Sequence, residues 1–178
     1  MTRAEGSVRR LHIGGKQVHR DWEILDAIPA AHVDHVGNAK DLSQFPDGTF
    51  AALYASHVLE HFDYKDEIAA VLREWRRVLI PGGTLYVSVP DMERLCHLYL
   101  TPGVSAETRF QLMRMLFGGH IDDYDYHLAG LDQWYLGTQL YEAGFSDVQR
   151  VRRFDIFHDT SEMELIGMPI SLNMIARN

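Results

Sequence analysis

The stretch that decides the fold runs from Phe50 to Val89 and reads FAALYASHVLEHFDYKDEIAAVLREWRRVLIPGGTLYVSV. Its two ends, Phe50–Ala55 and Leu85–Val89, are almost wholly apolar, which is typical of strands buried on both faces of a parallel sheet. Between them, apolar residues recur at steps of three and four from Ile68 to Leu79 and predict a helix with one apolar face. Pro81-Gly82-Gly83 should end that helix and lead into the second strand. The stretch therefore predicts a right-handed strand, helix, strand unit, which is the building block of an α/β fold.

The rest of the chain continues this pattern. Further apolar runs predict strands at 8–13, 23–25, 33–36, 148–151 and 170–175, and helical patterns occupy 91–100, 106–117 and 132–143. Asp132 is placed as an N-cap of the last helix, and Gly144 follows its C-terminus. The segment Gly118–His127 has no period and is expected to form an ordered loop. Because no repeat or low-complexity tract interrupts these 178 residues, we expect a single domain over 1–178.

Composition and charge exclude several classes of protein. The chain is 46% hydrophobic and 24% charged, as an ordinary globular domain is. Its formal net charge of −8 has the wrong sign for the phosphate backbone, so we expect no nucleic-acid partner. Cys96 is the single cysteine and allows no internal disulfide, and no apolar run has the length of a membrane span or a signal core. We therefore expect a cytoplasmic protein that does not bind membranes.

The turn after the first predicted strand has the chemistry of a ligand site. Gly14-Gly15 follows a strand that ends at Ile13, and residues without a Cβ atom let backbone amides approach a cofactor closely. The gap from Gly14 to Trp22 is too short for a crossover helix, yet long enough to return beside a short strand. Asp26 at the end of that second strand is then placed to bind a ribose diol. A plain tight turn and a solvated aspartate are the alternatives.

Several motifs together resemble a known family. They are LHIGG at 11–15, Asp26 after the second strand, GNAxDL at 37–42, ASHVLEHF at 55–62 and RVLxPGGxLxxSVPD at 77–91. The chain resembles class I S-adenosylmethionine-dependent methyltransferases, specifically the small predicted bacterial methyltransferases that lack the usual first helix. The resemblance implies a three-layer Rossmann-like fold with a seven-stranded, mainly parallel sheet whose last strand is antiparallel. It also implies S-adenosylmethionine as the cofactor, with S-adenosylhomocysteine as the product.

The resemblance carries over to individual residues. It implies that Gly14 and Gly15 lie under the methionine and ribose part of the cofactor, that Asp26 binds the ribose hydroxyls, and that Asn38 and Ala39 meet the adenine. The family more often has an aspartate where Asn38 stands and a third glycine in the turn. The full set of cofactor-binding residues that we expect is His12, Gly14, Gly15, Asp26, Asn38, Ala39, Ser56 and His57.

The stretch His57-Val-Leu-Glu60-His61 also fits a second motif. It satisfies HxxEH, the inverted zinc-protease motif, in which two histidines on one helix bind zinc. Here the motif follows a predicted strand instead of lying inside a helix. Three interpretations of this stretch are open. It could form the site of a zinc hydrolase that uses His57, Glu60 and His61, or it could bind a divalent metal that assists methyl transfer. In the third interpretation, Glu60 and His61 simply cap and pack the turn. We favour capping and packing, and therefore predict no metal.

The loop Gly118–His127 is our predicted substrate loop, because it follows the fifth strand, where open α/β sheets build the substrate side of their crevice. We expect transfer of a methyl group to an oxygen or nitrogen of a small molecule, such as a metabolite or sugar. The alternative is a catalytically silent cofactor-binding or partner module, and a homodimer is possible. The expected general bases are, in order, His127, His120 and His57, and the expected substrate-binding residues are His61, Tyr124 and Tyr126.

Overall fold

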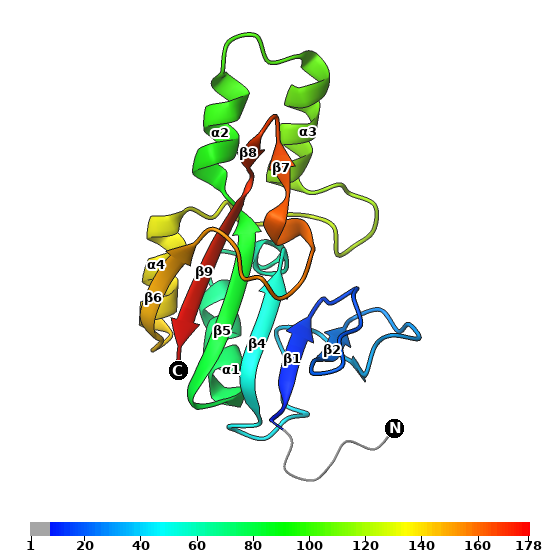
Figure 1. Ribbon diagram of the computed structural model, residues 1–178, viewed down its shortest axis with the longest axis vertical. Helices are drawn as coiled ribbons and strands as arrows, with labels where there is room; N and C mark the ends of the chain where they lie inside the picture. The colour runs from blue at the N-terminus through cyan, green and yellow to red at the C-terminus, as the bar shows by residue number, and fades with distance from the viewer. Residues whose placement is uncertain (1–7) are drawn as a thin grey trace.

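A seven-stranded sheet lies at the centre of the protein, which we describe from a computed structural model over residues 8–178 (Figure 1). The strand order is β3-β2-β1-β4-β5-β9-β6. Neighbours among β1 to β5 pair in parallel, whereas β9 runs antiparallel to β5 and to β6. This confirms the predicted α/β fold, with a mainly parallel sheet and an antiparallel last strand. The strands are β1 (Arg10–Ile13), β2 (Glu23–Asp26), β3 (His35–Val36), β4 (Phe50–Ser56), β5 (Leu79–Pro90), β6 (Ser146–Val151) and β9 (Ser171–Arg177), with β7 (Glu164–Leu165) and β8 (Met168–Pro169) forming a separate two-stranded sheet.

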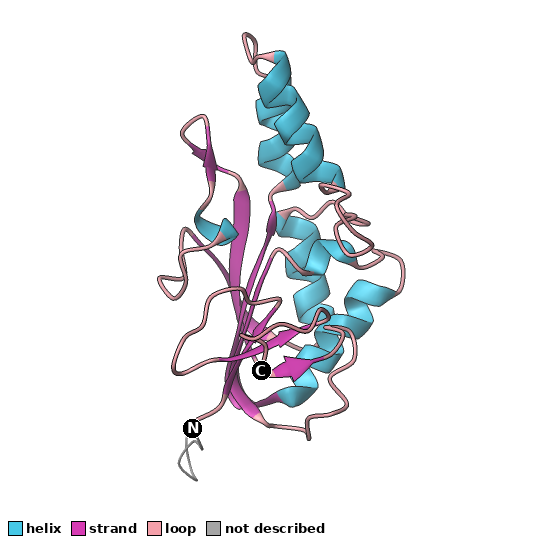
Figure 2. Ribbon diagram, turned by 90° about the vertical axis from the view of Figure 1, so that its right-hand side faces the viewer, coloured by secondary structure: helices cyan, strands magenta, loops and turns pink. Residues whose placement is uncertain are grey.

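Helices lie on one face of the sheet and beyond its carboxyl end. Helices α1 and α4 cover one face, and α2 and α3 project together past the end of β5 (Figures 1 and 2). The side chain of Asp132 accepts a hydrogen bond from the backbone nitrogen of Tyr135, which confirms the predicted N-cap. No helix within residues 8–178 has the length and apolar character needed to cross a bilayer. The helices are α1 (Glu67–Val78), α2 (Met92–Leu100), α3 (Ala106–Phe117) and α4 (Gln133–Glu142), with short 3₁₀ turns η1 (Leu59–His61) and η2 (Thr160–Glu162).

The alternation of side chains along the central strands builds two cores. On the helical face, Leu53 and Val87 pack in one core with Trp75 of α1, and all three are completely buried. On the opposite face, Tyr54 of β4 packs in an aromatic core with Phe157. Irregular chain and the short turn η2 cover this second face, as Figure 2 shows. On that side, packed aromatic side chains and irregular chain therefore cover the sheet in place of helices.

Two local features matter for the site. The chain from Gly14 to Trp22 forms turns and no helix, which confirms the expected absence of the usual first helix. The prediction that Pro81-Gly82-Gly83 ends the helix between β4 and β5 was wrong, because this helix, α1, ends at Val78 and β5 begins immediately at Leu79. The Pro-Gly-Gly segment instead lies within β5, where the register against β4 shifts. A proline nitrogen cannot donate to the ladder, so such a segment fits an irregular stretch of strand.

Candidate active site

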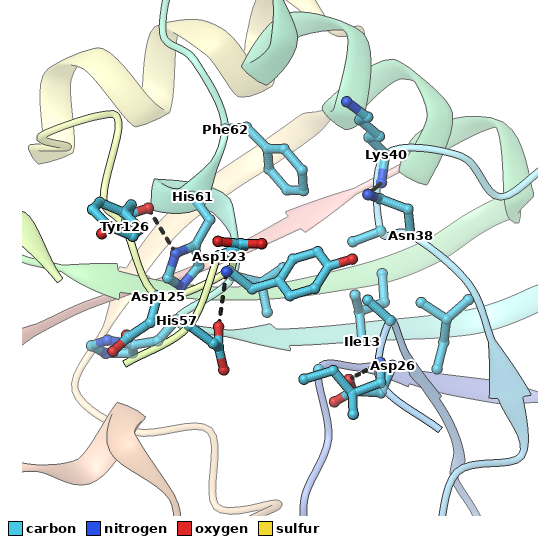
Figure 3. A pocket seen from close by; sticks show the side chains of 18 of the residues that line it. Ile13, Asp26, Asn38, Lys40, His57, His61, Phe62, Asp123, Asp125 and Tyr126 are labelled. Atoms are coloured by element: carbon cyan, nitrogen blue, oxygen red, sulfur yellow. Dashed lines mark hydrogen bonds between the residues drawn. The ribbon is translucent and has the colours of Figure 1, made fainter. Parts of the chain in front are cut away.

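A cavity of about 560 Å³ lies at the carboxyl ends of β1, β2, β3 and β4. In open α/β sheets this edge is where ligands bind, because the loops after the strands diverge there. Figure 3 shows Ile13, Asp26 and Asn38 on one side of it, and His61 and Tyr126 on the other. Of the predicted site residues, those that line the cavity are Gly14, Asp26, Asn38, Ala39, His57, His61, Tyr124 and Tyr126.

The two glycines after β1 have different roles. Gly14 lines the cavity with φ of +70°, and a Cβ atom there would lie 2.8 Å from the Val58 side chain. Gly15 is not among the lining residues, and a Cβ atom there would lie 2.7 Å from the ring of His12. Gly14 thus keeps the cavity wall open, while Gly15 makes room for a buried histidine.

His12 lies on the aromatic face of the sheet, outside the cavity lining. Its ring is 4.2 Å from that of Phe157 and 4.9 Å from that of Tyr54. Burial lowers the pKa of His12 to about 4. Ser56, at the end of β4, is also absent from the lining.

Asp26 is buried at the end of β2, next to the turn after β1. Its Oδ1 atom accepts a hydrogen bond from the backbone nitrogen of Ile28, and its Oδ2 atom lies 2.6 Å from Nζ of Lys16. Lys16 also lines the cavity, although we did not single it out from the sequence. The sequence feature that could have indicated Lys16 is its position directly after Gly14-Gly15, in the turn that we expected to lie near the ribose.

Asn38 and Ala39 follow β3 and line the same side of the cavity. The amide oxygen of Asn38 accepts a hydrogen bond from the backbone nitrogen of Lys40, so its NH₂ group is the part left to contact a ligand. The carbonyl oxygen of Ala39 accepts from the indole nitrogen of Trp75. This last bond joins the segment after β3 to helix α1 and holds it in place.

His57 follows β4 in a left-handed conformation with φ of +54°, which is uncommon outside glycine and is concentrated at functional sites. Its Nε2 atom lies 2.8 Å from Oγ of Ser171, and that hydroxyl donates to the carbonyl oxygen of Thr160. The Nε2 atom therefore carries the proton, and the lone pair is on Nδ1, which lies 3.4 Å from Oε1 of Glu60. Burial lowers the pKa of His57 to about 3, so the imidazole is neutral.

Glu60 is the most deeply buried acid next to the cavity, with a side chain 1% exposed. Neither carboxyl oxygen forms a hydrogen bond, and burial raises the pKa of Glu60 to about 8. Of the interpretation that this side chain caps and packs the turn, the capping is therefore wrong, whereas the burial fits the packing. Its backbone carbonyl oxygen is what holds the turn, because it accepts from the backbone nitrogens of Leu128 and Ala129.

The two histidines of the predicted substrate loop occupy different positions. His127 is partly buried beside His61, with ring centroids 4.9 Å apart, and its Nδ1 atom bonds to the carbonyl oxygen of Met115. Burial lowers the pKa of His127 to about 4. His120 is exposed, stacks on Tyr126 and uses Nε2 to bond to the carbonyl oxygen of Phe117. Neither His120 nor His127 is among the residues that line the cavity.

The HVLEH stretch does not form the helix that the inverted zinc-protease motif requires. His57 precedes the short turn η1, and only Leu59–His61 are helical in any sense. The zinc-hydrolase interpretation thus lacks its structural requirement.

Comparisons with known proteins agree with this description. Residues 9–87 match the model of a family described as a methyltransferase domain. The chain superposes over 98% of its length on 87% of an S-adenosylmethionine-dependent methyltransferase from Archaeoglobus fulgidus, with 15% identity and a TM-score of 0.59. No curated protein matches the chain.

Two further solved structures share the fold. One is the trans-methyltransferase CalH in complex with SAH, which matches at 18% identity and a TM-score of 0.58 over 96% of this chain and 51% of that one. The other is a chain of the complex between the Haloferax volcanii Trm112 methyltransferase activator and the putative methyltransferase, with 15% identity, a TM-score of 0.55, and coverage of 96% and 82%. This chain therefore spans about half the length of CalH.

The matched segment contains β1 to β4, η1, α1 and most of β5, and this segment, chiefly its loops, supplies most of the residues that line the cavity. The cavity lies where a class I fold holds its cofactor, at the carboxyl edge of the first strands. Gly14 and the carboxylate-bearing Asp26 both line the cavity at that edge. Residues 9–87 thus match a methyltransferase domain, and the whole chain has the fold of S-adenosylmethionine-dependent methyltransferases.

Proposed function

We propose that the chain transfers the methyl group of S-adenosylmethionine to an oxygen or nitrogen of a small molecule, such as a metabolite or sugar. The observation that carries this proposal is that one cavity joins the expected cofactor residues to the predicted substrate loop. Gly14, Asp26 and Asn38 lie on one side, and Tyr124 and Tyr126 on the other. A volume of about 560 Å³ is in the range of small-molecule sites.

The first side of the cavity fits the cofactor. Gly14 leaves open the space that a Cβ atom would fill, the Asp26 carboxylate suits two ribose hydroxyls, and the Asn38 amide suits an adenine edge. When bound there, S-adenosylmethionine supplies an electrophilic methyl group on a sulfonium. The residues of the chain need only orient it, and orientation provides much of the rate enhancement in such a displacement.

The second side suits a small polar acceptor. Tyr124 and Tyr126 are each about half exposed and offer aromatic faces to a sugar or ring, while Asp122, Asp123 and Asp125 provide hydrogen-bond acceptors. The acidic character of this loop disfavours phosphate-rich polymers as acceptors.

The acceptor's proton leaves toward a histidine cluster formed by His57, His61 and His127. His57 and His61 line the cavity, and His127 lies directly behind His61. The lowered pKa values of His57 and His127 keep both imidazoles neutral at pH 7, which leaves a lone pair on each ring but makes each a weaker base than a free histidine. His120 is not part of this cluster, because it is exposed, stacks on Tyr126 and does not line the cavity.

Methyl transfer can be tested with S-adenosylmethionine that carries a deuterated methyl group. The protein is incubated with a metabolite extract, and the label is then sought by mass spectrometry in the small-molecule, protein and nucleic-acid fractions. We expect labelled small molecules with the methyl group on oxygen or nitrogen, and less labelling with the Asp26→Asn variant at a limiting cofactor concentration. Label on a macromolecule or on carbon would overturn the proposal. Cofactor binding without transfer to any fraction would instead establish the catalytically silent module.

A further inference from the structure

Three side chains of metal-ligand type converge at the acceptor end of the cavity. They belong to Glu60, His61 and His127, and their ligand atoms all lie within 4.8 Å of one another. The first two come from the turn η1 and the third from the end of the substrate loop. The backbone nitrogens of Leu128 and Ala129 donate to the Glu60 carbonyl oxygen at 2.8 and 3.2 Å, which ties the two segments together.

The hydrogen bonds of the two histidines leave one nitrogen of each ring available. Nδ1 of His61 lies 3.0 Å from the carbonyl oxygen of Tyr126, and Nδ1 of His127 lies 3.0 Å from that of Met115. A carbonyl oxygen only accepts, so both rings carry their proton on Nδ1 and their lone pair on Nε2. This is how metal-binding histidines are usually held, with the second ring nitrogen donating to a backbone carbonyl or carboxylate.

Glu60 supplies an independent sign of a missing partner. Its side chain is 1% exposed, and neither carboxyl oxygen has a hydrogen bond. Two ring nitrogens lie near Oε1 of Glu60 but form no hydrogen bond with it. They are Nδ1 of His57, at 3.4 Å, and Nε2 of His127, at 3.9 Å. Burying a carboxyl group without a partner is costly, and a cation at this point would remove the cost.

We propose that Glu60, His61 and His127 bind one divalent transition-metal ion, with Zn²⁺ as the first candidate. Two imidazoles and one carboxylate form a common ligand set of catalytic zinc sites, which leaves a fourth position open. The set differs from the HxxEH motif, because His127 takes the place of His57, whose Nε2 atom is bound to Ser171. This proposal departs from our sequence-based expectation that the chain has no metal.

The role of this metal rests on the proposed function. His61 lines the cavity, so the open coordination position is near the acceptor. An acceptor oxygen or nitrogen in that position is polarised by the metal and loses its proton more readily. His61 and His127 are then ligands of the metal and do not act as bases.

Metal binding can be measured without any methyl acceptor. The full chain is stripped with a chelator and titrated with Co²⁺, which reports its coordination through visible absorption, and then with Zn²⁺ in competition. We expect one ion per chain with a low-coordinate spectrum. Glu60→Gln and His127→Gln should each weaken binding by roughly 100-fold or more, at or above the cost of losing an outer partner of a metal site. His97→Gln, on the exposed surface of α2, is the matched control and should change affinity less than about 2-fold.

The possible outcomes separate the metal site from the proposed function. Absence of stoichiometric Co²⁺ binding, or equal binding by the Glu60, His127 and His97 variants, would overturn the metal site. His61→Gln provides a further test if Glu60→Gln does not fold, as judged by its thermal unfolding. Methyl transfer that is unchanged after chelation would overturn the role of the metal while leaving the proposed function intact. Specific Co²⁺ binding by a protein that methylates no small molecule would uphold the site and refute the function.

Discussion

Lys16 and Asp26 form an ion pair at the wall of the cavity, with Nζ 2.6 Å from Oδ2. The pair joins the turn after β1 to the end of β2, two segments that no helix connects. The other carboxylate oxygen accepts from the backbone nitrogen of Ile28. The carboxylate is thus held in one orientation at the cavity wall before any ligand arrives.

Replacing Asp26 with asparagine should weaken cofactor binding by roughly 1–3 kcal/mol, the value of hydrogen bonds to a charged group. Calorimetric titration with S-adenosylhomocysteine measures this change. Lys16→Met is the matched control, because Lys16 is largely exposed and its ion pair should contribute about 1 kcal/mol or less. If the wild type and Asp26→Asn bind S-adenosylhomocysteine with equal affinity, Asp26 does not contact the cofactor.

Gly14→Ala should destabilise the protein and reduce its affinity for the cofactor. The left-handed backbone alone costs an alanine roughly 1–2 kcal/mol, and the added Cβ atom would lie 2.8 Å from Val58. Gly82→Ala is a matched control, since Gly82 also has a positive φ of +75° but open space around it. Urea unfolding should therefore show a larger loss for Gly14→Ala, and two equal losses would mean that the wall at Val58 yields easily.

Gly118→Ala should open the substrate loop while leaving the cofactor end intact. Gly118 has φ of +90°, and a Cβ atom there would clash with the carbonyl oxygen of Asp125. We expect faster proteolysis within 118–127 and weaker acceptor binding, with cofactor affinity preserved. Gly103→Ala, with φ of +83° and no neighbour within 4 Å, provides the comparison. Loss of cofactor binding in the Gly118 variant would contradict the division of the cavity into two sides.

His12 should make the protein less stable in mild acid. Because burial lowers its pKa from 6.5 to about 4, the unfolded chain binds a proton at pH values where the folded chain does not. The free energy of unfolding therefore decreases as the pH falls from about 6.5 to about 4, by up to about 3 kcal/mol from this residue. Urea unfolding at about pH 8 and about pH 5 measures the difference.

The variant His12→Gln isolates this contribution from that of the other buried histidines. It lowers stability at both pH values, since the aromatic packing with Phe157 is lost, but it has no group that titrates there. The stability difference between the two pH values should therefore shrink relative to the wild type. An unchanged difference would assign the acid sensitivity to other groups.

The periodic parts of the chain could be predicted from local sequence, and the contacts between distant loops could not. The β4, α1 and β5 unit follows from the spacing of apolar residues, and Asp132 follows from the chemistry of a helix N-terminus. Each of these depends on residues within a few positions of one another. The helix boundary before Pro81 was missed because β5 absorbs the Pro-Gly-Gly segment through an irregular register with β4.

The candidate site divides in the same way. Gly14, Asp26, Asn38 and Ala39 were predicted from motifs and do line the cavity. The meeting of Glu60 with His127 was not foreseeable, because it depends on backbone hydrogen bonds between η1 and residues 128–129. The burial of Glu60 likewise arises only when the loop packs on the turn, so the sequence favoured a capping role that its side chain does not have.

The most direct test of the account is a crystal structure of the chain with S-adenosylhomocysteine bound. We expect the ribose hydroxyls beside Asp26, the adenine beside Asn38 and Ala39, and the sulfur facing the side of the cavity formed by His57 and His61. That arrangement would establish that one cavity holds the methyl donor next to the acceptor loop. A ligand bound on the aromatic face near His12, or one whose sulfur points away from the loop, would contradict the account.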